Sequence, residues 1–190
     1  PPHWRGIGTL GSKRLGAPSP RNTRIGHNMS LAEPPALDMV RFEAQVHSAV
    51  SSVDDPEYPG ISIVDLGLLE TISVSPDGTA SIGLIPTFSG CPALAVIADD
   101  VVAAVQALPE VASCTVEWLA SPAWHADRVS HEARSCLERK FTVAVQIGDR
   151  STTCPLCASK TVEQSMFGPS RCRSVHTCTG CGETVEVMRG

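Results

Sequence analysis

The stretch PTFSGCPALAVIADDVVAAVQAL, Pro86 to Leu108, decides the fold because it joins a strand-like segment to a long helix through one turn. Pro92 occupies a position favoured at the first turn of a helix, which predicts Cys91 as the N-cap. The helix dipole and free N–H groups would stabilise a thiolate there, although a small buried cap residue is the alternative. The apolar stripe recurs at helical spacing: Leu94, Ile97, Ala98, Val101, Val102, Val105 and Leu108.

The segments around this stretch predict a helix–strand–strand–helix–strand order. Two short Ile- and Val-rich runs flank the turn residues 76–78, which is typical of a hairpin, and residues 111–119 form a third strand pattern. Upstream, a helix is expected to begin at the N-cap Asp38 and to end before Pro56. We therefore predict an α+β fold with the helices packed on one face of a small sheet. The first helix carries an apolar face of Met39, Phe42, Val46, Val50 and Val53.

The cysteines predict a second, smaller domain. The chain has eight cysteines and lacks a secretory signal, which favours reduced thiols used for metal or redox chemistry. Because they crowd toward the end, we place a boundary near Asp149, with an assembly-type domain at 36–149 and a metal knuckle at 150–190. Cys114 and Cys136 lie in strand and helix patterns and are interpreted as structural.

The C-terminal cysteines have the spacing of a zinc ribbon. Cys154-x2-Cys157 and Cys178-x2-Cys181 are separated by 20 residues, and each turn can direct two sulfurs at one ion. Zinc and an iron–sulfur cluster both accept this ligand set, whereas two redox pairs would need a βαβ context. Cys172 or His176 could replace a ligand, or Cys172 could be a spare thiol. A closed four-thiolate site is structural because no position stays open for a substrate.

Several function classes find no support in the residues. The chain has no Gly-rich phosphate loop, no Gly-x-Ser-x-Gly elbow and no His-Glu-x-x-His element, so we interpret the segment around His131 and Glu132 as a solvated helix. No histidine is placed beside Cys91 as a base, which disfavours an enzyme acting alone. Residues 30–190 carry ten bases against twenty acids, which argues against nucleic-acid binding by a zinc ribbon.

The first 29 residues differ from the rest in carrying five bases and no acid. We expect them to be a disordered leader upstream of a natural start at Met29. An organelle transit peptide is the alternative, but the stretch lacks an amphipathic face. No apolar run reaches the roughly 18 residues that a membrane span needs, so we expect a soluble, cytoplasmic protein.

Several short motifs together resemble one family. The chain from about Met39 to Val187 is similar to the SufT-like metal–sulfur cluster assembly domain family and, with its knuckle, to the D-subunit family of the phenylacetyl-CoA epoxidase system. The motifs are residues 55–59 (DPEYP), 62–68 (SIVDLGL), 86–92 (PTFSGCP), Trp118-x2-Ser121-Pro122-x-Trp124, and Phe167-Gly168-x-Ser170-x-Cys172. The chain departs from the family at Ala158, where glycine is common, and at 139–143, where the family has a Gly-Ile-Ala-Pro-Pro linker.

The resemblance implies a non-catalytic accessory subunit. In this family an oxygenase subunit carries a di-iron centre and a separate reductase carries flavin and iron–sulfur, so these subunits are the expected partners, with a homodimer left open. The residue matching Cys91 is a suspected transfer thiol for transient iron or a cluster. Asp65 and Thr87 join it if their loops meet at one end of the sheet. A general iron–sulfur cluster carrier is the alternative.

Overall fold

The first predicted helix is confirmed as α1, Met39–Ser51, in the computed structural model, which describes residues 38–148 and 151–189. The Asp38 side chain caps it by accepting a hydrogen bond from the Arg41 N–H at 3.2 Å. The face formed by Phe42, Val46 and Val50 is buried. The expected leader and the start at Met29 lie outside the described residues.

The predicted hairpin and third strand form a three-stranded sheet. Strands β1, Leu69–Val74, and β2, Thr79–Leu84, are antiparallel and meet at Gly78, whose φ of +84° suits the turn. The helix α2, Leu94–Gln106, then returns the chain to β3, Ser113–Trp118, which runs parallel to β2. The sheet order is β1-β2-β3, and the predicted order of elements is confirmed.

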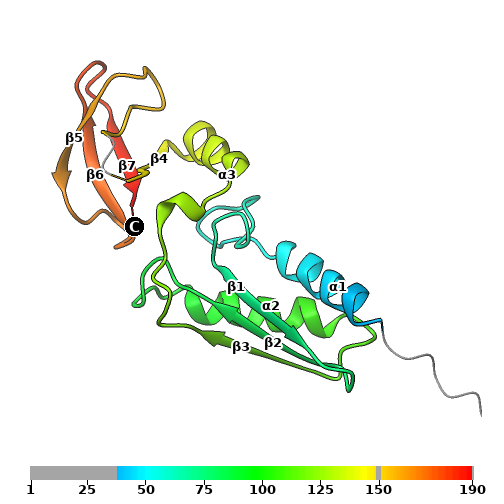
Figure 1. Cartoon of the computed structure of the whole chain (residues 1–190). Helices are drawn as coiled ribbons and strands as arrows, with labels where there is room; N and C mark the ends of the chain where they lie inside the picture. Colours follow the sequence, from blue (N-terminus) through cyan, green and yellow to red (C-terminus); the bar gives the residue numbers. More distant parts are fainter. Residues whose placement is uncertain (1–37, 149–150, 190) are drawn as a thin grey trace, which may run out of the picture. The chain divides into compact units, whose positions relative to one another are not determined.

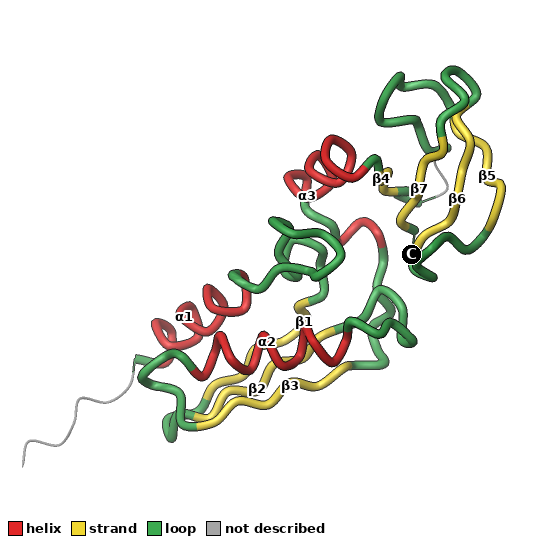
Figure 2. Tube along the Cα trace, turned by 180° about the vertical axis from the view of Figure 1, so that it is seen from behind, coloured by secondary structure: helices red, strands yellow, loops and turns green. Residues whose placement is uncertain are grey.

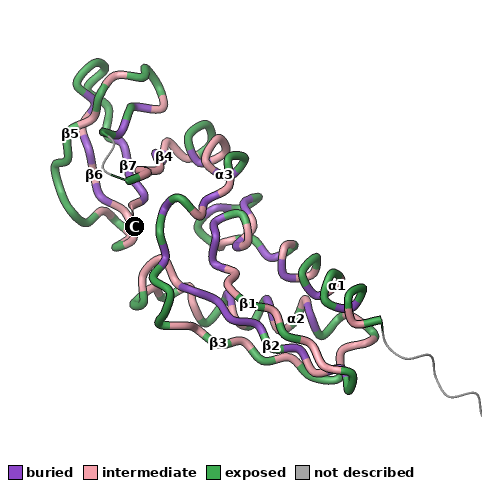
Figure 3. Tube along the Cα trace, viewed as in Figure 1, coloured by how far each residue is buried: buried purple, intermediate pink, exposed green. Residues whose placement is uncertain are grey.

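Both helices cover the same face of this sheet, as the two opposite views show (Figures 1 and 2). The core between them is apolar and takes most of its strand residues from β2 (Figure 3). Its largest fully buried side chains include Phe42, Ile82, Leu84, Ile97 and Val101. This apolar core contains none of the cysteines of the two Cys-x2-Cys turns.

The motif segment 62–68 is hydrogen-bonded to the segment that contains Trp124 and Arg128. The Trp124 indole donates to the Leu66 carbonyl at 2.9 Å, and Arg128 Nε donates to the Gly67 carbonyl at 2.8 Å. Gly67 has a φ of +76°, and a Cβ there would lie 2.4 Å from the Arg128 Cβ, so only glycine fits. Arg128 belongs to the short 3-10 helix η1, Ala126–Arg128, which follows the Trp124 motif.

The solvated helix expected after Trp124 is α3, His131–Cys136, capped by Ser130, whose hydroxyl accepts from the Ala133 N–H at 3.1 Å. It continues as a single π-helical turn η2, Leu137–Phe141, and ends at Thr142 with a φ of 55°. Of residues 139–143, which depart from the family's linker, 139–141 therefore extend the helix, and 143 already belongs to the next strand.

The remaining strands form a four-stranded sheet in the order β4-β7-β6-β5. They are β4, Val143–Val145; β5, Thr161–Ser165; β6, Arg173–Cys178; and β7, Thr184–Met188. Strand β4 pairs with β7 although it precedes the boundary that we place near residue 149. The buried cluster special to this sheet is small: Ala144, Cys154, Cys178, Val185 and Val187.

Among the described residues, no helix has the length and apolar character required to cross a membrane.

Candidate functional site

Four cysteine side chains converge at one end of the second sheet. The Sγ atoms of Cys154, Cys157, Cys178 and Cys181 all lie within 4.8 Å of one another. Cys154 and Cys178 are buried, whereas Cys157 and Cys181 are exposed. Four thiolates this close would repel one another strongly, so their arrangement fits a cation held tetrahedrally at the centre.

The two cysteine turns have the same backbone structure. In each turn, the N–H of the first cysteine donates a hydrogen bond to the carbonyl five residues ahead. Cys154 donates to Ser159 at 2.8 Å, and Cys178 donates to Glu183 at 2.9 Å. The carbonyl of the first cysteine also accepts a hydrogen bond from the N–H four residues ahead, which belongs to Ala158 at 2.8 Å in one turn and to Gly182 at 3.1 Å in the other. This repeat aims two pairs of sulfurs at one point, as the spacing predicts.

Polar groups favour the ionised forms of two of the four thiols, whereas the Glu183 backbone N–H is outweighed by the neighbouring thiols, which raise the pKa of Cys181 to about 12. The Ser159 hydroxyl and backbone N–H lower the pKa of Cys157 to about 6. The backbone N–H of Cys181, 3.5 Å from the Cys178 sulfur, lowers the pKa of that thiol. Metal binding requires thiolates, so these groups reduce the proton release that binding entails. The donor set suits zinc and an iron–sulfur cluster equally.

The repeat yields a matched pair of substitutions. Ala158 has a φ of 58° and the equivalent Gly182 a φ of 76°. The left-handed conformation costs a residue with a Cβ roughly 1–2 kcal/mol. Glycine avoids this cost but loses more chain entropy on folding, which costs about 0.5–1 kcal/mol. We expect Ala158→Gly to stabilise the metal-loaded protein by up to about 1 kcal/mol and Gly182→Ala to destabilise it similarly. Thermal unfolding measures both. A lower melting temperature for Ala158→Gly would contradict the assignment.

Cys91 lies in a turn that precedes α2, and its prediction as the N-cap is wrong. The helix begins at Leu94 with Ala93 as N-cap and no side-chain cap. The Cys91 N–H donates to the Phe88 carbonyl at 3.1 Å, and its carbonyl accepts from Leu94 at 3.3 Å. These two successive tight turns place the start of the α-helix two residues later than predicted, at Leu94 instead of Pro92. The thiol is half-buried.

Cys91 opens onto a pocket of about 310 Å³ that it shares with Cys172. Cys172, for which the sequence leaves open an additional ligand or a spare thiol, is not part of the four-cysteine group. The pocket walls come from both sheet-bearing parts of the chain, which belong to the same compact unit. The lining residues are Glu57, Phe88, Gly90, Cys91, Pro92, Pro169, Ser170, Arg171 and Cys172.

The other predicted site residues lie outside this pocket. Thr87 lines another hollow of about 560 Å³ with Trp118 and Trp124, and Phe88 lines both hollows. The exposed Asp65 lines neither hollow, and its carbonyl accepts from Ser130 at 2.8 Å. His176 is buried with its ring nitrogens 3.0 Å from the Thr161 and Ser174 hydroxyls, and it lies outside the four-cysteine group.

Residues on both sides of Cys172 are bound to the DPEYP motif. The Ser170 hydroxyl donates to Glu57 Oε1 at 2.6 Å. Arg173 donates to the Tyr58 hydroxyl and pairs with Glu57 at 3.6 Å. Burial raises the pKa of Cys172 to about 11; the Arg173 cation opposes the rise, and Glu57 and the Cys91 thiol add to it.

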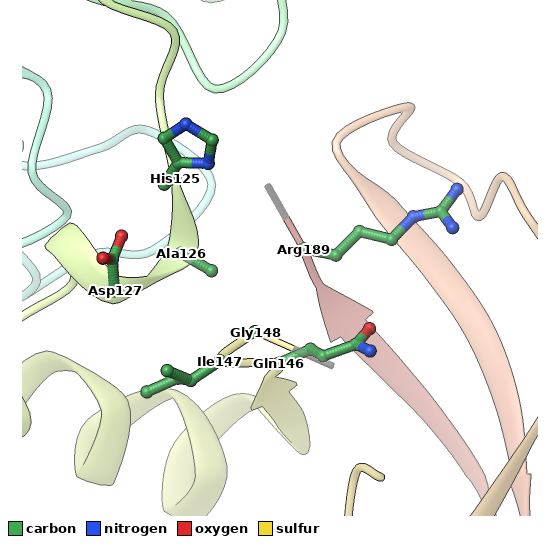
Figure 4. A pocket seen from close by; sticks show the side chains of 7 residues that line it. All are labelled: His125, Ala126, Asp127, Gln146, Ile147, Gly148 and Arg189. Carbon is green, nitrogen blue, oxygen red and sulfur yellow. The ribbon is translucent and has the colours of Figure 1, made fainter. Parts of the chain in front are cut away.

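A separate hollow of about 510 Å³ is lined by His125, Asp127 and Arg189, with Ala126, Gln146, Ile147 and Gly148 (Figure 4). His125 and Asp127 come from one segment, and the Arg189 side chain extends away from them toward Glu163, 3.4 Å from its carboxylate. No cysteine is among these lining residues. Within the described part of the chain, no group of three or more metal-ligating residues other than the four cysteines converges.

Cys114 and Cys136 lie apart from both sets of thiols. Cys114 is half-buried on β3, where burial raises its pKa, and Cys136 ends α3. No spacing signal in the sequence predicts the Cys91–Cys172 pocket. The nearest hint is that DPEYP and the segment before Cys172 both belong to the motif set, which spacing alone cannot bring together.

Two family models match the chain in tandem. A model described as iron–sulfur cluster assembly protein matches residues 43–118, and one described as PaaD zinc beta ribbon domain matches residues 139–189. The second match begins in η2 and includes β4, which agrees with the pairing of β4 in the C-terminal sheet.

Similar proteins divide into those that match both parts and those that match one. A protein of Escherichia coli (strain K12), whose name describes a candidate D-subunit of 1,2-phenylacetyl-CoA epoxidase, is 30% identical over 76% of this chain and 93% of its own length. An Fe-S protein maturation auxiliary factor, YitW of Bacillus subtilis (strain 168), is 36% identical over 50% of this chain and 93% of its own length. The maturation auxiliary factor SufT of Staphylococcus aureus (strain USA300) is 35% identical over 45% and 96%.

A solved structure supports the fold of the first part. The domain of unknown function DUF59 from Bacillus anthracis superposes with a TM-score of 0.51 at 30% identity, over 54% of this chain and 96% of that chain.

Proposed function

The chain belongs to the family in which an iron–sulfur cluster assembly domain precedes a PaaD zinc beta ribbon, and on that premise we propose that it assists the assembly or repair of a metal centre in the phenylacetyl-CoA epoxidase system. Its clients are the oxygenase or the reductase component, in the cytoplasm. The chain acts as an accessory subunit, and Cys91 is the thiol that handles the cargo.

The observation that carries this proposal is the separation of Cys91 from the four-cysteine group. The four thiols complete a closed site among themselves, and a closed tetrahedral site leaves no position for exchange. Cys91, in contrast, is a half-buried free thiol in an open pocket of the assembly domain. A thiol that holds iron only transiently needs such access for the client.

The proposal is tested by growth of a deletion strain on phenylacetate as the sole carbon source. We expect little growth, because an oxygenase without its metal centre cannot start the pathway, and recovery when the full chain is supplied. Growth on succinate serves as the control and should not change. Normal growth on phenylacetate would contradict the link to the epoxidase.

A second candidate function is a general carrier or assembly factor for iron–sulfur proteins. The matches to YitW and SufT favour it, because these proteins bear maturation names and match about half of this chain. In that case the deletion strain would grow on phenylacetate but lose the activity of other iron–sulfur enzymes, such as aconitase. An assay of aconitase activity in cell lysate measures this loss.

A further inference from the structure

We propose that Cys91 and Cys172 together form the cargo site, a two-thiolate site for ferrous iron shared between the assembly domain and the ribbon. The inference rests on the proposed function, which it deepens by adding a second ligand from the other domain. It also gives the ribbon a part in handling cargo besides holding its own metal.

The pocket that contains both thiols has the size and lining of a small-ion site with an open mouth. Its volume is about 310 Å³, and the two cysteines line it from segments 81 residues apart in the chain. Glu57 lines the same pocket, with its carboxylate bound by Ser170 and Arg173. Thiolates select soft and borderline cations.

The ribbon residue is held in place by contacts on both sides. Ser170, two residues before Cys172, donates to Glu57 at 2.6 Å, and Arg173, directly after it, pairs with Glu186 at 2.9 Å and stacks over the Tyr58 ring at 5.3 Å. Tyr58 is buried and packs edge-on against Phe141 at 5.2 Å. Cys172 is therefore positioned by a built contact between the domains.

The chemistry of such a site is ligand exchange without electron transfer. When Fe²⁺ binds, the S–H bonds of Cys91 and Cys172 break, two Fe–S bonds form, and two protons pass to water. Release reverses this, because the client's ligands replace the two sulfurs, which regain protons. Two protein thiolates leave coordination positions open for the client, which the closed four-thiolate group does not.

The test is a metal titration with the four-cysteine group already filled. Protein that holds one zinc per chain is titrated anaerobically with Co²⁺, a probe for Fe²⁺ whose thiolate complexes absorb light. We expect wild type to bind one further ion with a thiolate-to-cobalt band. Loss of an outer-shell partner lowers metal affinity roughly tenfold or more. Cys91→Ser and Cys172→Ser each remove a direct ligand, so each should weaken cobalt binding by more than about tenfold. Cys114→Ser, a half-buried cysteine outside the pocket, is the matched control and should bind as wild type.

Labelling of the wild-type chain gives a second measurement that needs no variant. Bound Co²⁺ should slow the alkylation of both Cys91 and Cys172 by iodoacetamide, as measured by mass spectrometry, and leave Cys114 unaffected. Protection of Cys91 alone, or cobalt binding by Cys172→Ser as tight as by wild type, would overturn the two-thiol site. Neither outcome would decide the proposed function, which the growth test addresses separately. Cobalt binding through both cysteines beside normal growth on phenylacetate would instead support the site and contradict the proposed client.

Discussion

Serine in place of Cys154 is expected to reduce the metal content from one ion per chain to near zero and to unfold the ribbon. Structural zinc contributes on the order of 10–16 kcal/mol in small zinc domains. Apart from Val143 and Met188, which belong to the larger core, the ribbon has a buried cluster of only five residues, and two of them, Cys154 and Cys178, are in the four-cysteine group. Metal analysis and hydrogen exchange of β5 and β6 measure the two effects.

The same substitution should leave the first sheet intact. Its core is formed by α1, α2 and β2 and includes no knuckle cysteine. Amide protection in α1 and β2 is thus the internal control, and Cys136→Ser is the matched variant. A Cys154→Ser protein that kept one tightly bound ion and full protection in β6 would refute the metal-dependent ribbon.

Serine in place of Cys91 is expected to leave the fold unchanged and to reduce epoxidase activity in cells to the level of the deletion strain. The side chain is half-buried in a turn, and the Phe88 and Leu94 contacts there use only the Cys91 backbone, so stability should change by no more than about 0.5 kcal/mol. A hydroxyl is a far weaker ligand for iron than a thiolate, so cargo binding should fail.

Cys114→Ser is the control for a generic effect of losing a thiol, and it should support wild-type activity. The melting temperature and zinc content of Cys91→Ser identify a folding defect if one exists. Full epoxidase activity from a folded Cys91→Ser protein would eliminate the transfer-thiol hypothesis.

The regular elements were predictable because each depends on local chemistry. The apolar spacing of residues 39–53 and the turn at Gly78 act over a few residues, and both appear in the structure as predicted. The four-cysteine group was predictable for the same reason, since two Cys-x2-Cys turns leave one geometry for their sulfurs.

The predictions that differed depend on contacts between distant segments or on competing turns. Pro92 allows a helix start, but the bonds from Cys91 to Phe88 and Leu94 complete a turn first, so the N-cap moved to Ala93. Cys172 lies near the knuckle in sequence, yet Arg173 anchors that segment to Tyr58. The two residues are 115 positions apart in the chain, so no local sequence pattern predicts their contact.

Metal transfer in vitro examines directly whether Cys91 passes iron to a client. The protein is loaded anaerobically with zinc at the four cysteines and with ⁵⁷Fe²⁺ elsewhere, and is then mixed with iron-free oxygenase or reductase in the presence of a chelator that removes free iron. We expect ⁵⁷Fe to appear in one of these clients when wild type is the donor, with no gain from Cys91→Ser. Equal transfer from both donors, or none from wild type to either client, would contradict this expectation.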